Sequence, residues 1–207
     1  MFTDMSVNQF LDALASKAPV PGGGSGAALG GALAAGLLSM VCNLTIGKKS
    51  YSDVEDEMKD ILARSEELRK RLPDLLEEDT RVYSQVMDTY RMPKETEDEK
   101  ASRTEAMQSA LKNAAQVPMR IAECCARIIE LCLPAAHKGN KWAVSDAGVA
   151  ALMGEAALRS AALNVWINLG AITDEEFVKK ESAKLEALLA GKSDLKEEVF
   201  SVVRAKL

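Results

Sequence analysis

The sequence predicts an all-α fold, a single-domain helical bundle over residues 1–207 with a buried helix rich in glycine and alanine and no sheet. Three observations support this prediction. Apolar residues recur at helical spacings of three and four, and no segment keeps the alternation of a strand. Hydrophobic residues make up 47% of the chain but aromatic residues only 4%, so small aliphatic side chains must fill the core. A length of 207 residues suits one well-buried core rather than two domains.

Residues 5–46 predict two helices joined by a glycine-rich turn. An amphipathic helix is expected over residues 5–16, and the proline- and glycine-rich segment 19–24 is expected to be a loop. The next helix is expected to run from Ser25 to about Ile46. Small residues repeat on it every four positions, which allows another helix to approach closely; they are Gly26, Gly30 and Ala34, and Ala27, Gly31 and Ala35.

Residues 18–47 contain no charged side chain, and this length alone suits a membrane span. The segment holds eight glycines, six alanines and two prolines, which contribute little free energy of transfer into a bilayer. We therefore expect its helix to be buried inside a soluble bundle and expect no membrane partner.

Charged, periodic segments and capping residues predict the remaining helices. A helix over residues 52–92 is expected to bend or divide at Pro73. Thr96 and Glu99 form a capping box that begins the next helix, which Pro118 is expected to break or restart near Val117. Residues 119–138 should then form a helix that ends at Gly139 in a left-handed cap.

Three further helices complete the expected bundle. Ser145 and Asp146 are expected to open a long apolar helix that ends at Gly170. Asp174 and its neighbours cap another helix, and residues 194–206 form a short final one.

Composition excludes several classes of function. A net charge of −5, from 26 basic and 31 acidic residues, argues against a protein that binds nucleic acid. A single histidine argues against histidine-rich metal sites and Ser-His-Asp catalysis. No secretory signal is evident, and the cysteines form no Cys-x-x-Cys pair, so we expect a cytoplasmic protein with reduced, mostly buried thiols at Cys42, Cys124, Cys125 and Cys132.

Asp79 is the residue whose position most strongly indicates chemistry. An apolar stripe on the helix of residues 52–92 places a carboxylate at position 79, where packing would favour leucine; its members are Leu72, Leu76, Tyr83, Val86 and Tyr90. A buried carboxylate is costly unless it is paired, and its pKa is usually displaced. Asp79 is therefore a candidate acid or base, or alternatively a structural residue bonded to a neighbouring helix end or arginine.

Other polar residues allow both a structural and a functional interpretation. Residues 22–25 precede a helix start and offer free N–H groups to an anion, although an ordinary turn between helices has the same pattern. Lys48 and Lys49 could neutralise a substrate carboxylate or simply complement the helix dipole. Asn164 and Asn168 continue a stripe of small residues, and hydrogen bonding between helices is the favoured interpretation. His137 is most simply a capping cation.

Several motifs together resemble the cyclodeaminase/cyclohydrolase family of folate enzymes. The family includes the cyclodeaminase half of formiminotransferase-cyclodeaminase and stand-alone bacterial methenyltetrahydrofolate cyclohydrolases. Residues 42–49 and 160–165 are most similar to the stand-alone branch. The resemblance covers nearly the whole chain, in order, through residues 21–25, 39–41, 47–49, 79–80, 92–94, 139–140, 145–147 and 164–165.

The resemblance implies an all-helical enzyme, typically a homodimer, with its folate site near the subunit interface. Asp79 matches the family's catalytic carboxylate, which agrees with its position in the apolar stripe. The resemblance implies a folate substrate and no metal or redox cofactor. It further implies substrate contacts from Gly22, Gly23, Gly24, Ser25, Lys48, Asn140, Ser145 and Asp146.

Three functions remain open at this point. The expected activity is a methenyltetrahydrofolate cyclohydrolase, which adds water to 5,10-methenyltetrahydrofolate and gives 10-formyltetrahydrofolate. The alternative is a formiminotetrahydrofolate cyclodeaminase, which releases ammonia and gives the methenyl compound. A non-catalytic helical protein that binds a partner helix is the second alternative, but it leaves Asp79 in an apolar stripe without a reason.

Overall fold

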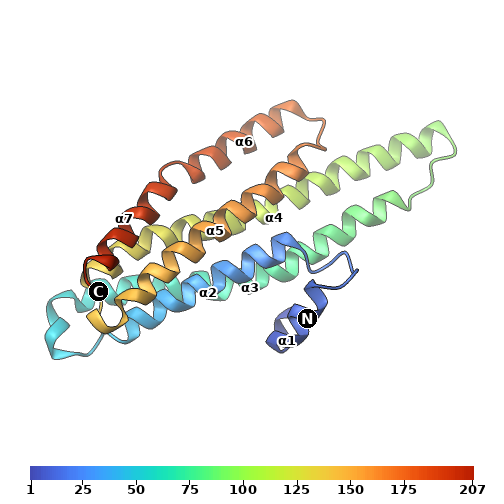
Figure 1. The fold of residues 1–207 in the computed structure, drawn as a ribbon. Helices are drawn as coiled ribbons and strands as arrows, with labels where there is room; N and C mark the ends of the chain where they lie inside the picture. Colours follow the sequence, from blue (N-terminus) through green and yellow to red (C-terminus); the bar gives the residue numbers. More distant parts are fainter.

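The computed structural model describes residues Met1–Leu207 and confirms the all-α prediction (Figure 1). It contains no strand. Short 3-10 helices lie at Phe2–Asp4, Lys49–Val54 and Lys141–Ala143. The seven α-helices are α1 (Val7–Leu14), α2 (Gly23–Asn43), α3 (Glu55–Tyr90), α4 (Glu97–Lys138), α5 (Val144–Leu169), α6 (Glu175–Leu189) and α7 (Lys192–Arg204).

Four long helices form the centre of the molecule. Helices α2, α3, α4 and α5 pack in a closed order, α2 on α3, α3 on α4, α4 on α5 and α5 on α2, and α2 also contacts α4 across the bundle. Helix α7 packs on α4 and α5, and α6 makes fewer contacts with the same pair. Figure 1 shows α1 standing to one side of this bundle. One continuous core of 46 buried apolar residues joins the helices.

Helix α2 lies in this core, as its small residues predicted. A Cβ built on Gly31 would stand 2.8 Å from Cys125 Sγ of α4, so only glycine allows this approach. On an adjacent side of α2, Gly30 lies against Ala157 of α5. Helix α2 is long and apolar enough to cross a membrane by length and composition, a test that buried core helices of soluble proteins also meet.

Two helices continue through prolines at which the sequence predicted a bend or a break. Helix α3 contains Pro73, and α4 contains Pro118 and Pro134. A proline inside a helix removes one hydrogen bond and costs about 3 kcal/mol. Both helices bury an apolar face along much of their length, which offsets this cost. Of the bend or division expected at Pro73, the division is therefore not found, and the break expected at Pro118 was wrong.

Some predicted helix ends were also wrong. Helix α2 begins at Gly23 rather than Ser25, because Gly22 is the N-cap and the next two glycines adopt helical geometry. Gly139 ends α4 with extended backbone, at φ −68° and ψ 167°, rather than in a left-handed cap. A 3-10 turn leads into α5, so that Ser145 lies within the helix and is not its N-cap.

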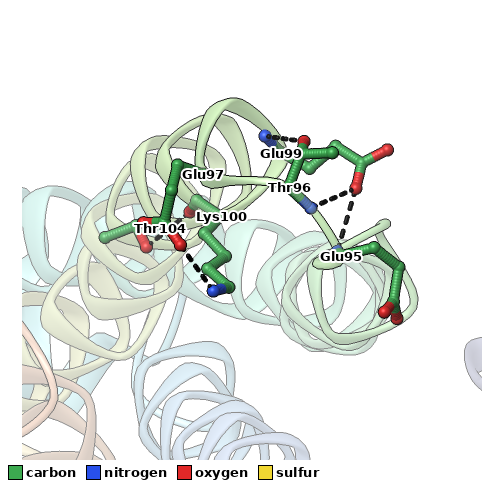
Figure 2. A network of polar contacts seen from close by, with 6 residues as sticks. All are labelled: Glu95, Thr96, Glu97, Glu99, Lys100 and Thr104. Carbon is green, nitrogen blue, oxygen red and sulfur yellow. Dashed lines mark hydrogen bonds and ion pairs between the residues drawn. The ribbon is translucent and has the colours of Figure 1, made fainter.

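Other helix ends agree with the sequence. Figure 2 shows the capping box of α4, in which Thr96 Oγ1 accepts a hydrogen bond from the Glu99 N–H at 3.2 Å. Glu99 Oε2 accepts hydrogen bonds from the N–H groups of Thr96 and Glu95 at 3.0 and 2.9 Å. Gly170 follows α5, and Asp174 caps α6 through the Phe177 N–H. The starts of α4 and α6 are fixed by local side-chain chemistry, which the sequence displays directly.

All four cysteines are free and buried, as expected. Burial raises the pKa of the Cys42 thiol to about 12 and that of Cys124 to about 11, so both remain protonated thiols near neutral pH. They pack as small apolar residues in the core.

Candidate functional site

Asp79 lies on α3 beside the N-terminal turn of α2. Ser25 Oγ donates a hydrogen bond to Asp79 Oδ2 at 2.9 Å. Burial raises the pKa of the Asp79 carboxyl above its ordinary value of 3.8, and hydrogen bonds from the Ser25 side chain and backbone oppose this rise. The carboxylate is therefore half-buried, held by one neighbouring helix and more readily protonated than an exposed aspartate.

Gly24 allows the two helices to meet at this point. A Cβ built on Gly24 would stand 2.3 Å from Asp79 Oδ1 and 2.8 Å from Oδ2. The N-cap of α2 is Gly22, which has no side chain to accept a hydrogen bond from the first turn. Asp79, on α3, supplies that acceptor. The structural alternative from the sequence, an aspartate bonded to the end of a neighbouring helix, therefore describes its contacts correctly.

The same carboxylate lines an open cavity of about 300 Å³. The segment that precedes α2 and the helices α3, α4 and α5 form its walls, and no lysine or arginine lines it. Asp79 is its one carboxylate. The lining residues are Pro19, Val20, Gly22, Gly23, Gly24, Asp79, Val82, Tyr83, Val86, Ala114, Asn164, Ile167 and Asn168. This space is called the Asp79 cavity below.

Two asparagines of α5 complete the polar lining, and the sequence did not assign them to the site. Asn164 Nδ2 donates to the Ser160 carbonyl of its own helix at 2.8 Å, and Asn168 Nδ2 donates to the Asn164 carbonyl at 2.8 Å. Asn168 Nδ2 also lies 3.4 Å from the Ala114 carbonyl of α4, a long hydrogen bond between helices. The predicted bonding between helices is therefore found for Asn168 alone. In the sequence, the position of Asn164 and Asn168 in a stripe of small residues was the signal that could have indicated a role at the site.

The structure brings Gly22, Gly23, Gly24, Ser25 and Asp79 together but places the other predicted site residues elsewhere. Lys48, Asn140, Ser145 and Asp146 lie near the opposite end of α2, which is about 30 Å long. Figure 1 shows the segment joining α2 to α3 at that end of the bundle.

Asn140 has structural contacts at that end. Its backbone N–H donates to Thr45 Oγ1 at 2.8 Å, its Nδ2 donates to the Leu44 carbonyl at 2.8 Å, and its Oδ1 accepts from the Trp142 N–H at 3.1 Å. Asn140 is buried, whereas Lys48 and Ser145 are exposed. The exposed Lys48 and Ser145 can reach an Asp79 cavity only if it belongs to a second copy of the chain.

The Asp79 cavity is suited to a cationic organic molecule. Its one formal charge is the carboxylate, which can stabilise a nearby positive charge and accept a proton. The aliphatic and aromatic walls suit a flat, partly apolar ligand. No group of three or more His, Cys, Asp or Glu side chains is placed to hold a metal ion.

Comparison with known proteins agrees with the motifs. The formiminotransferase-cyclodeaminase family model matches residues 6–187. A methenyltetrahydrofolate cyclohydrolase of Methylorubrum extorquens is 46% identical over 202 residues, which cover 98% of this chain and 97% of that protein. A formimidoyltransferase-cyclodeaminase of Mus musculus is 32% identical over 90% of this chain, which spans only 34% of that longer protein. The crystal structure of a formiminotetrahydrofolate cyclodeaminase from Thermotoga maritima superposes with a TM-score of 0.88 at 35% identity, covering 99% of this chain and 98% of that one.

Proposed function

The chain belongs to the formiminotransferase-cyclodeaminase family, and from this we propose that it is a methenyltetrahydrofolate cyclohydrolase. The observation that carries the proposal is the 46% identity, over nearly the full length of both chains, to a stand-alone cyclohydrolase. The Asp79 cavity agrees with it, because its one charged group suits a substrate that is itself a cation.

The reaction assigns two tasks to Asp79. In 5,10-methenyltetrahydrofolate, one carbon joins N5 to N10 as a delocalised cation, which the carboxylate stabilises. A water molecule attacks that carbon and transfers one proton to Asp79, which gives a neutral adduct. The C–N5 bond then breaks, N5 takes up the proton, and the hydroxyl oxygen becomes the formyl oxygen with loss of its own proton. The products are 10-formyltetrahydrofolate and one net proton.

The direct test of this proposal is the decay of the methenyl chromophore. The purified chain is expected to accelerate the loss of its absorbance far beyond the rate in buffer, with 10-formyltetrahydrofolate as the product. No acceleration, together with no thermal shift on addition of tetrahydrofolate derivatives, would instead support the non-catalytic helical protein.

The cyclodeaminase is the second candidate, because the superposed structure from Thermotoga maritima carries that name at 35% identity. In that reaction N10 attacks the formimino carbon and ammonia leaves, with Asp79 as the proton relay. If the chain releases ammonia from 5-formiminotetrahydrofolate with a kcat/KM above that for the methenyl compound, its main activity is the cyclodeaminase and not the cyclohydrolase.

We also propose a homodimer, because α2 and α5 expose a shared row of apolar side chains. Leu33 is 52% exposed, Leu163 64% and Ile167 74%, on neighbouring helices that pack together. Exposed apolar rows of this extent mark interaction surfaces. The row, called the α2–α5 face, consists of Leu33, Met40, Leu44, Val149, Leu152, Leu163 and Ile167.

A two-fold, antiparallel pairing through the α2–α5 face would bring Lys48 of one copy towards Asp79 of the other. Lys48 would then neutralise a substrate carboxylate at the partner's cavity. Sedimentation velocity is expected to give twice the chain mass. Co-expressed Asp79→Asn and Lys48→Ala chains are expected to recover about a quarter of the wild-type sites, because each mixed dimer keeps one intact site. Activity no higher than the mean of the two variants would contradict shared sites.

The proposal also covers cofactors, cellular location and binding partners. No metal or redox cofactor is needed, because the substrate already carries an activated carbon. The protein is cytoplasmic, where its buried thiols stay reduced. It binds neither nucleic acid nor a membrane, because its net charge is −5 and its most apolar helix, α2, buries 11 of its 21 residues in the core and exposes others on the proposed dimer face.

A further inference from the structure

The side-chain carbonyl groups of Asn164 and Asn168 have no role in the fold. The Nδ2 group of each is already used by a backbone carbonyl, at 2.8 Å in both cases. A carbonyl oxygen only accepts hydrogen bonds, so neither amide can be turned around without losing that bond. Each Oδ1 atom therefore faces away from its own helix's carbonyls, and neither accepts a hydrogen bond from the chain.

These two acceptors belong to the same cavity as Asp79. Both asparagines line it, and they lie one helical turn apart on α5. A Cβ built on Gly23 would stand 3.4 Å from the Asn164 amide, whereas one on Gly24 would overlap Asp79. The first turn of α2 thus faces Asn164 at Gly23 and Asp79 at Gly24, and the cavity presents acceptors from α5 and from α3.

From this arrangement we propose that Asn164 and Asn168 bind the donor edge of the substrate's reduced pterin ring, with the 2-amino group and N8–H as the two donors. The proposal rests on the proposed function, since it names the part of a tetrahydrofolate that these residues hold. The 2-amino group and N8–H flank N1 on one edge of the ring, and the one-carbon bridge at N5 lies on the opposite side. Binding that edge at α5 turns the bridge towards Asp79.

The two asparagines therefore set orientation and selectivity. A ring that lacks these donors leaves two amide oxygens without partners in a partly enclosed space, which weakens binding. A ring bound in the reverse sense would place its one-carbon bridge away from the carboxylate. Proper orientation of reacting groups is a large part of catalysis by binding.

Binding of 5-formyltetrahydrofolate and of its 8-deaza analogue, which lacks only the N8–H donor, tests the proposal. Affinities are measured by calorimetry for the wild type and for Asn164→Leu and Asn168→Leu. The wild type is expected to bind the analogue about tenfold more weakly, and at least one leucine variant is expected to show no such difference. The same variants should raise KM for the methenyl compound about tenfold and change kcat less. Ser160→Ala, one turn away on α5, keeps the carbonyl that Asn164 uses and should change neither quantity.

The outcomes separate this inference from the proposed function. If the wild type consumes the methenyl compound but neither variant alters discrimination between the two ligands, the asparagines do not hold the donor edge. If the discrimination is present and the wild type lacks cyclohydrolase activity, the inference stands and the proposed reaction is wrong. If the leucine variants have a lower melting temperature but unchanged KM and unchanged discrimination, the asparagines have a structural role only.

Discussion

Replacing Asp79 by asparagine is expected to lower kcat for hydrolysis of the methenyl compound by about 10²- to 10⁴-fold, the usual contribution of a positioned acid–base group. The introduced amide keeps an oxygen that can accept the 2.9 Å hydrogen bond from Ser25, so the first turn of α2 retains its acceptor. The amide cannot stabilise a cation by charge or accept a proton at neutral pH. Initial rates from the methenyl absorbance and the far-ultraviolet circular dichroism spectrum measure the two effects.

The direction of the change in stability caused by Asp79→Asn follows from the pKa of Asp79. Because the folded state raises the pKa of Asp79 above 3.8, it binds that proton more tightly than the unfolded chain does. Any stabilisation linked to this proton is complete below about pH 4 and is lost as pH rises through the folded pKa. The variant's amide carries no such charge, so its melting temperature at pH 7 should equal or exceed that of the wild type. Full activity, or loss of activity only through unfolding, would contradict the assignment.

Ser25→Ala is the matched control for the carboxylate's hydrogen bond. Removal of the hydroxyl leaves the charge in place but withdraws a contact that lowers the pKa of Asp79. The acid limb of the kcat/KM profile, which reports the ionised base, is expected to move to higher pH, while activity at the alkaline plateau is largely kept.

The parts of the fold that follow local rules were predictable. Helix periodicity and the Thr96 capping box depend on residues close in sequence, and both predictions were confirmed. The division considered at Pro73 and the break expected at Pro118 were not found, because the gain from packing a long apolar face is a tertiary effect that local propensity omits. The start of α2 was misplaced for a related reason, since Asp79, which bonds the Ser25 hydroxyl and backbone in the first turn, lies more than fifty residues away in the sequence.

The part of the site that could be predicted from the sequence was the residue whose side chain did not match the apolar face of its helix. Asp79 interrupts an apolar stripe, and the structure places it in a cavity. Asn164 and Asn168 gave a weaker signal, because asparagine among alanines also suits a bond between helices, and their free oxygens are visible only once the Nδ2 partners are known. The distance between Lys48 and Asp79 depends on helix packing, which spacing in the sequence does not reveal.

Gly24→Ala is expected to have the second largest effect, a loss of about 100-fold or more in kcat. The added Cβ would stand 2.3 Å from Asp79 Oδ1 and 2.7 Å from its Cγ, far inside van der Waals contact. The carboxylate must move away, which breaks its hydrogen bond to Ser25. Displacement of a reacting group by about 1 Å can cost about 10²-fold in rate. Methenyl absorbance gives the rate and thermal denaturation gives the stability, which should also fall because α2 loses its acceptor.

Gly36→Ala on the same helix separates this clash from a general effect of alanine in α2. Its Cβ would meet only Arg69 Cδ at 3.8 Å, an ordinary contact, so activity should be unchanged and the helix stabilised by up to about 1 kcal/mol. The double variant Gly24→Ala with Asp79→Ala removes the clashing carboxylate. If the clash destabilises the single variant, the double variant should be more stable than the sum of the two single changes. Additive losses would place the effect of Gly24→Ala in the backbone of α2 instead, and the close approach of Gly24 to Asp79 would then not explain the lost activity.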